Sequence, residues 1–231
     1  MLKSILFLLL FVSADLSSQG QYNRFDQDSV FLDYFKNHKT IAVLPFRVES
    51  VLRPKVERKM PPAQKALMEY TLGYDVQETI IKVFSNKQND KSALFSIQDS
   101  SLTNQILKEA GINQNNYTDF SPQELGELLR VDAVISGNLK TWKPIGSGWA
   151  YLLNTTDILD DDDDIVDDFS NNKVPAIIGE IEIYLVNTKD ESVLWKYNGS
   201  NSVGGANDMN GLIAKIIRRS AKSFPYFYIK N

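Results

Sequence analysis

Five consecutive aspartates form the densest group of chemically active side chains in the sequence: Asp160, Asp161, Asp162, Asp163 and Asp164. Dense carboxylates suit hard cations, and calcium takes roughly six to eight oxygen ligands. An EF-hand loop, however, alternates its ligands around a central glycine, and this run contains no glycine. Consecutive aspartates also repel one another and stay extended in water. Two interpretations stand: a solvated acidic loop, or a weak site for calcium or for a basic partner.

The chain contains no cysteine and a single histidine, His38. Thiol catalysis, disulfides, iron–sulfur centres and thiolate zinc sites are therefore excluded. A Ser–His–Asp triad would have to use His38, which lies among lysines in the segment KNHKT, and no G-x-S-x-G segment accompanies it. We interpret His38 as a structural residue, and we expect neither enzymatic activity nor a cofactor.

Charge is distributed unevenly along the 231 residues, whose formal net charge is −4. Residues 157–168 hold eight aspartates and no basic residue, and the rest of the chain has 21 acidic residues against 25 basic ones. The sequence thus predicts a mildly basic domain that carries one acidic loop insertion, which we place at residues 154–173.

Two other segments are candidates for contact with a partner. Residues 47–62 show no clean hydrophobic period and end in two prolines, so we expect a long exposed loop with a basic bias. Without interleaved aromatic residues, this loop does not indicate nucleic-acid binding. The aromatic tail near residue 226 either packs on the sheet or forms a contact patch. The contact residues predicted from both segments are Arg53, Lys55, Arg58, Lys59, Tyr226, Phe227 and Tyr228.

The first twenty residues have the pattern of a secretory signal peptide. Lys3 supplies a positive charge, residues 5–12 are continuously apolar, and small and polar residues follow. The apolar run is shorter than the ~20 residues of a membrane-spanning helix. We therefore expect residues 1–20 to be a signal peptide and the protein to be exported, with no transmembrane segment.

Hydrophobic periodicity predicts alternating strands and helices after a short helical segment within residues 21–39. Strands are expected at residues 41–46, 93–97, 131–139, 177–186 and 192–197, and helices at residues 63–84, 100–110, 122–129 and 212–221. Asp99 or Ser100 and then Ser121 are the expected N-caps, and Gly111 the expected helix stop. This order predicts an α/β fold over residues 40–231, with a single mixed β-sheet of about five strands packed with helices.

Several segments resemble the CsgG-like family and the amino-terminal domain of TolB. The resemblance covers most of residues 40–225 and is strongest in two helices and the strand that follows them. The matching residues are Leu102, Ile106, Leu107, Lys108, Glu109, Gly111, Leu125, Gly126, Leu129, Val131, Asp132, Ala133, Val134 and Gly137. The strand at 41–46 and the hairpin from 186 to 195 are also similar to family elements.

The resemblance implies a sandwich of sheet and helices in a protein of the bacterial envelope. Lipid-anchored members need a cysteine, which this chain lacks, and the aspartate run is unsuited to a membrane barrel strand. We therefore expect a periplasmic, outer-membrane-associated or extracellular protein without a lipid anchor or a pore. It would act in outer-envelope assembly or secretion by contacting other envelope proteins or further copies of itself. The alternative is a ligand- or calcium-binding module that uses residues 157–168.

Overall fold

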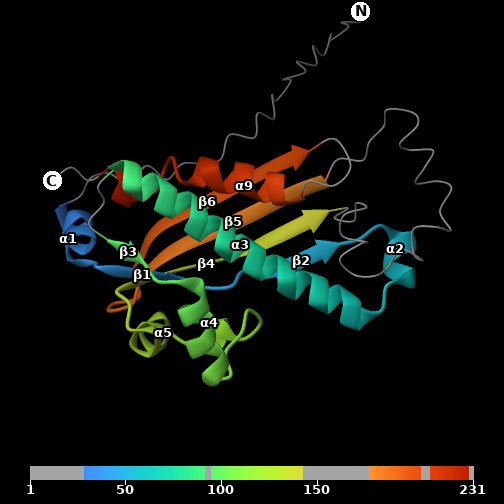
Figure 1. Ribbon diagram of the computed structural model, residues 1–231, viewed down its shortest axis with the longest axis horizontal. Helices are drawn as coiled ribbons and strands as arrows, with labels where there is room; N and C mark the ends of the chain where they lie inside the picture. The colour runs from blue at the N-terminus through green and yellow to red at the C-terminus, as the bar shows by residue number, and fades with distance from the viewer. Residues whose placement is uncertain (1–28, 92–94, 143–176, 204–208, 229–231) are drawn as a thin grey trace, which may run out of the picture.

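The computed structural model describes residues 29–91, 95–142, 177–203 and 209–228. The predicted signal peptide at 1–20 and the acidic insertion at 154–173, with its five aspartates, lie outside the described residues. The described ranges form one six-stranded mixed sheet with helices packed on both faces (Figure 1). This confirms the predicted α/β class.

Helices and strands are interspersed along the described residues. In order they are α1 (Ser29–Asn37), β1 (Thr40–Val43), β2 (Arg47–Val51), α2 (Pro54–Lys59), α3 (Pro62–Lys91), β3 (Ser96–Ile97), α4 (Ser100–Glu109), the 3₁₀ turn η1 (Tyr117–Asp119), α5 (Pro122–Leu129), β4 (Ala133–Trp142), β5 (Ile177–Asn187), β6 (Val193–Val203), α9 (Met209–Ser220) and the 3₁₀ turn η2 (Pro225–Phe227).

The sheet combines a parallel half with an antiparallel half. Strand β1 lies between β3 and β4 and is parallel to both, whereas β4, β5 and β6 are antiparallel neighbours. Strand β2 continues the path of β1 along β4, because Ile41 pairs with Ala133 and Val51 pairs with Trp142 at the other end of the same strand. The long strand β4 therefore holds the two halves of the sheet together.

Alternate residues along β1 and Leu44, which directly follows it, face two separate hydrophobic clusters, as expected for a strand that is covered on both faces. Ile41 and Val43 belong to the larger cluster, to which α3 and α9 contribute. Ala42 and Leu44 belong to the smaller one, with residues of α4 and α5. Figure 1 shows α3 and α9 on one side of the sheet and α4 and α5 on the other.

The longest helix, α3, does not break at Gly73, although glycine costs about 1 kcal/mol in a helix relative to alanine. A Cβ at Gly73 would lie 2.2 Å from the carbonyl oxygen of Phe46. The Gly73 carbonyl also accepts a hydrogen bond from the Phe46 amide, at 3.2 Å. The missing side chain thus lets the helix lie directly against the segment that joins β1 to β2.

Two helix starts and one helix stop follow the predicted chemistry. Asp99 accepts the amide of Ser101 at 2.9 Å at the start of α4. Ser121 and Glu124 form a reciprocal capping box at the start of α5, where each side chain accepts the other residue's backbone amide. Gly111 follows α4 with a φ of 72°, a conformation that glycine adopts without strain.

The exposed loop predicted for residues 47–62 is wrong, because this segment forms β2 and α2. In β2, exposed and buried residues alternate, and Val48 and Ser50 face inward. Helix α2 begins at Pro54 and buries Val56, so both elements gain packing that a loop would lack. On β2, the amide of Ser50 donates to the Glu69 carboxylate of α3, at 2.8 Å.

Candidate functional site

The single histidine lies in a buried polar network at the end of the molecule that holds α1 (Figure 1). The Nε2 nitrogen of His38 lies 3.1 Å from Oδ1 of Asn187, and its Nδ1 nitrogen contacts the Tyr226 hydroxyl. Because the amide oxygen can only accept, Nε2–H donates to Asn187, and Nδ1 accepts the proton of Tyr226. Both ring nitrogens are thus occupied when the imidazole is neutral.

Burial favours the neutral forms of the two central groups in this network. It lowers the pKa of His38 below the ordinary value of 6.5. It also raises the pKa of the Tyr226 hydroxyl well above its usual value, and the nearby Asp132 charge acts in the same direction. A neutral imidazole that accepts from a neutral phenol has no free nitrogen with which to take a proton from a substrate.

Asp190 joins the network to the surface. Its carboxylate accepts hydrogen bonds from Ser192 Oγ at 2.6 Å, from Asn187 Nδ2 at 2.5 Å and from the Tyr34 hydroxyl. The bonds from Ser192 and Tyr34 are the main reason why the pKa of Asp190 lies well below its ordinary value. The network therefore ties α1, the β5–β6 turn and η2 together, which is a structural role.

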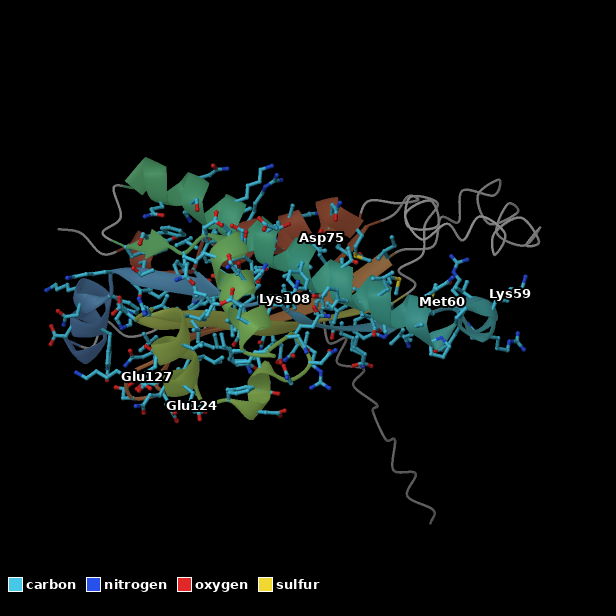
Figure 2. All side chains as sticks on the ribbon, turned by 60° about the horizontal axis from the view of Figure 1, so that its bottom comes forward. Lys59, Met60, Asp75, Lys108, Glu124 and Glu127 are labelled. Carbon is cyan, nitrogen blue, oxygen red and sulfur yellow. The ribbon has the colours of Figure 1, made fainter. Side chains whose placement is uncertain are left out.

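The predicted basic contact residues lie in and beside α2, at the opposite end of the molecule from α1 (Figure 1). Arg58 and Lys59 are exposed, and Arg53 is half-buried. The backbone of Lys55 lies in the same helix. Figure 2 shows Lys59 at the outermost part of this end. The one acidic residue of α2, Glu57, pairs with Lys65 of α3 at 3.2 Å, which links the two helices.

The predicted aromatic contact residues are placed differently from one another. Tyr226 and Phe227 are only 5% and 4% exposed, whereas Tyr228 is 54% exposed. The Phe95 ring lies 4.7 Å from the Tyr226 ring, and the Phe84 ring lies 5.7 Å from the Phe227 ring. The tail thus packs into the larger hydrophobic cluster, and only Tyr228 presents a ring to solvent.

A second apolar stripe on α3 was not predicted from the sequence. Ala63, Leu67, Tyr70 and Tyr74 follow one another at helical spacing, away from the buried stripe that contains Met68. Leu67 is 56% exposed and Tyr70 is 43% exposed. The Tyr70 and Tyr74 rings lie 4.8 Å apart, and the Tyr70 hydroxyl donates to that of Tyr74 at 2.9 Å. The signal for this stripe was the spacing of residues 67, 70 and 74.

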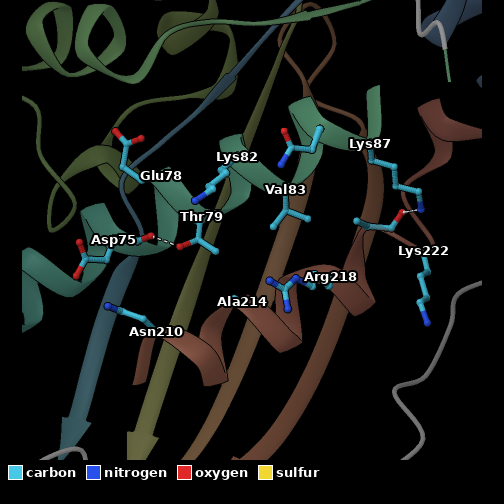
Figure 3. Close-up of a pocket in the computed structure, with 12 residues that line it drawn as sticks. Asp75, Glu78, Thr79, Lys82, Val83, Lys87, Asn210, Ala214, Arg218 and Lys222 are labelled. Carbon is cyan, nitrogen blue, oxygen red and sulfur yellow. Dashed lines mark hydrogen bonds between the residues drawn. The ribbon is translucent and has the colours of Figure 1, made fainter. Parts of the chain in front are cut away.

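A groove of about 640 Å³ runs between α3 and α9 (Figure 3). Asp75 and Glu78 line one part of it. The cationic residues of the lining are Lys82, Lys87, Arg218 and Lys222. Burial, and the charge of Glu78 beside it, raise the pKa of Asp75. The groove therefore has an acidic part, formed by Asp75 and Glu78, and a part with four cationic residues.

The part of the chain that the structure describes has neither a metal-binding cluster nor a membrane-spanning helix. Within residues 29–91, 95–142, 177–203 and 209–228, no three or more acidic or histidine side chains are grouped to hold a metal ion. None of the helices in these ranges is long and apolar enough to span a membrane.

The chain matches no family model and no curated protein in sequence. Several solved structures share part of its arrangement. Lipoprotein GNA1162 from Neisseria meningitidis is 14% identical, with a TM-score of 0.41, and the match covers 80% of this chain and 96% of that one. The PelC dodecamer from Paraburkholderia phytofirmans is 8% identical, with a TM-score of 0.40, and the match covers 80% of this chain and 88% of that one.

A third similar structure is the C-terminal domain of LpoB from Salmonella enterica. It is 6% identical, with a TM-score of 0.31, and the match covers 73% of this chain and 84% of that one. None of the three proteins is named as a CsgG-like protein or as TolB. The resemblance to those two groups therefore stays a prediction.

Proposed function

We propose that the protein is an exported component of the bacterial envelope that acts by contacting other proteins and not by catalysing a reaction. It would serve outer-envelope assembly or secretion, in the periplasm, at the outer membrane or outside the cell. The contact surface is the end of the molecule formed by α2 and the first half of α3, which we call the α2–α3 surface.

The stripe formed by the exposed Leu67 and Tyr70 and the half-buried Tyr74 is the observation that carries this proposal. Large apolar side chains at neighbouring helical positions are costly to leave in water, and tyrosine is favoured at protein interfaces. The hydrogen bond between the two hydroxyls and the contact between the two rings hold Tyr70 and Tyr74 in one arrangement. The two tyrosine side chains therefore lose little conformational entropy when a partner binds them.

The charges at the same end favour a partner with an acidic rim. Arg58 and Lys59 are exposed, while the neighbouring Glu57 is engaged by Lys65. Such charges mainly accelerate encounter and select the partner, and the apolar residues supply most of the affinity.

A role without catalysis is supported by the state of His38. Both of its ring nitrogens are committed to hydrogen bonds inside the protein. Its low pKa also keeps it neutral at pH 7. A general base must instead reach the proton that it removes.

Photo-crosslinking in the organism of origin tests the proposal. A crosslinking amino acid at position 70 should yield a discrete adduct, and Leu67→Asp should abolish it. Leu102→Asp is the matched control, because Leu102 is a similarly exposed leucine, at 48%, on α4. An adduct that contains two copies of the chain would identify the partner as the protein itself. If no adduct forms, or if both aspartate variants abolish it equally, the proposal is wrong.

A further inference from the structure

The apolar stripe on α3 has the same spacing in both directions along the helix. Its four members are separated by four, three and four residues: Ala63, Leu67, Tyr70 and Tyr74. Because an α-helix turns roughly 100° per residue, all four fall within an arc of about 60° on one side of α3. A stripe with this spacing can pack against an identical stripe that runs in the opposite direction, which is the geometry of a two-fold contact.

The stripe faces away from the rest of the protein, where a second helix can approach it. Met68 and Leu72 lie on the buried side of α3, and by helical geometry the stripe lies on the opposite side. The groove that α9 forms with α3 begins at Asp75, one residue beyond the stripe (Figure 3). Helix α9 therefore leaves this part of α3 accessible, in agreement with the exposure of Leu67 and Tyr70.

Large and small side chains complement each other when two copies of the stripe run antiparallel. Leu67 then lies level with Tyr70 of the second copy, and Ala63 lies level with Tyr74 of the second copy. The small Ala63 leaves room for the larger tyrosine, and no member of the stripe has to meet its own copy. Ala66, which is also exposed, lies beside the stripe and is small enough for the two helix axes to approach to ~8–10 Å.

The antiparallel direction also brings opposite charges together. Arg58 and Lys59 are exposed just before the start of α3, and Glu78 is exposed about one turn after Tyr74. Figure 2 shows Lys59 beyond one end of α3 and Asp75 further along the helix. When two copies pack antiparallel, the basic end of each therefore lies alongside the acidic stretch of the other. A parallel arrangement would instead bring the cations of the two copies together.

We propose that the partner at the α2–α3 surface is a second copy of this chain, a step that rests on the proposed function. The two-fold axis passes between Leu67 and Tyr70, and the two α3 helices run antiparallel. Because each copy uses the same residues, the contact closes at two chains. One pair of helices forms an interface at the small end of the usual range, so the dimer exchanges with the monomer and depends on protein concentration.

Analytical ultracentrifugation of the purified protein measures this dimer directly. We expect the average mass to rise with concentration toward twice that of the monomer. Leu67→Asp should raise the dissociation constant at least ~tenfold, because it places an unpaired charge at the centre of the contact. Leu102→Asp is the control and should leave the dissociation constant unchanged, since Leu102 lies on α4. A protein that stays monomeric up to ~0.1 mM overturns the proposal, as does an equal loss in both variants.

Reversal of single charges tests the antiparallel direction. Lys59→Glu alone and Glu78→Lys alone each place like charges at both ends of the contact, and each should weaken the homodimer roughly threefold to tenfold. An equimolar mixture of the two variants has opposite charges at both ends of the mixed dimer. The mixture should therefore recover the affinity of the unchanged protein. If it associates no better than either variant alone, the antiparallel contact is wrong.

The crosslinking amino acid at position 70 separates the dimer from the proposed function. In the antiparallel contact, position 70 lies level with Leu67 of the second copy, so we expect an adduct that contains two copies of the chain. That adduct supports both proposals. An adduct with a different protein, together with a monomeric purified protein, overturns the dimer and leaves the proposed function standing. The absence of any adduct overturns both.

Discussion

The two ends of the molecule place polar and apolar side chains in opposite ways. At the end that holds α1, His38, Asn187 and the Tyr226 hydroxyl are buried and bonded to one another. At the end that holds α2, Leu67 and Tyr70 are exposed. A buried polar group must be bonded, and an exposed cluster of large apolar groups needs a reason of its own. The polar groups of the first end are therefore satisfied by contacts inside the protein, and the exposed apolar groups of the second end are the basis of the proposed partner surface.

The largest expected effect on stability comes from disrupting the His38 hydrogen-bond network at the end that holds α1. His38→Ala leaves a cavity and removes the acceptor of the Tyr226 hydroxyl, so we expect the free energy of unfolding to fall by about 2–4 kcal/mol. Urea unfolding followed by circular dichroism measures this change. A loss below about 1 kcal/mol would show that the network contributes little and that the contrast between the two ends is weaker than proposed.

Tyr226→Phe is the matched variant for this network. It keeps the ring in the larger hydrophobic cluster and removes only the hydroxyl that bonds to His38. The expected loss is about 1–2 kcal/mol. The two losses should be less than additive in the double variant, because both changes remove the same hydrogen bond.

Lowering the pH should also destabilise the His38 network, with a smaller loss in the free energy of unfolding than His38→Ala causes. Above the ordinary histidine pKa of 6.5, His38 is neutral in the folded and the unfolded chain. Below that pH, the unfolded chain takes up a proton that the folded chain resists, because burial lowers the pKa of His38 in the fold. The free energy of unfolding should therefore fall as the pH drops below about 6.5.

A variant without the titrating group isolates this contribution. Urea unfolding of His38→Gln over the same range should show a smaller decline, with the contribution of Asp190 appearing only below its ordinary pKa of 3.8. Identical slopes in the two proteins would contradict the assignment of the decline to His38.

The smallest expected effect is on the stability of the exposed end. Leu67→Ala should change the free energy of unfolding by no more than about 0.5 kcal/mol, because the side chain is already largely in water. Leu102→Ala is the control, and both changes are measured by thermal unfolding. A loss of ~2 kcal/mol at position 67 would indicate that this leucine packs within the fold, which would remove it from the proposed partner surface.

Much of the fold was predictable because its signals are local. The N-caps at Asp99 and Ser121 and the stop at Gly111 rest on short-range chemistry that the sequence states directly. Helix α3 was underestimated, since its apolar period ends near Phe84 while the helix continues to Lys91. Strand β2 was missed because its stability comes from pairing with β4, about ninety residues away, and five residues are too few to show a period.

The candidate site was less predictable because it depends on contacts between distant segments. The structural interpretation of His38 agrees with its burial, but its partner Asn187 lies 149 residues away and could not be identified from the sequence. Aromatic residues such as Tyr226 and Phe227 occur both in cores and at interfaces, so their type alone does not tell where they lie. Their contacts with Phe84 and Phe95 place them in the core. The groove depends likewise on how α3 lies beside α9.

The hydrogen bond from the Ser50 amide to the Glu69 carboxylate has a consequence for self-assembly. Within the described residues, β2 has a strand partner only in β4, so its other side is an edge at which a further strand could add. The Glu69 carboxylate already accepts the hydrogen bond of the Ser50 amide, which such a strand would need. It also places a negative charge where a foreign backbone carbonyl would have to lie. The Glu69 carboxylate therefore disfavours the addition of a further strand at the β2 edge.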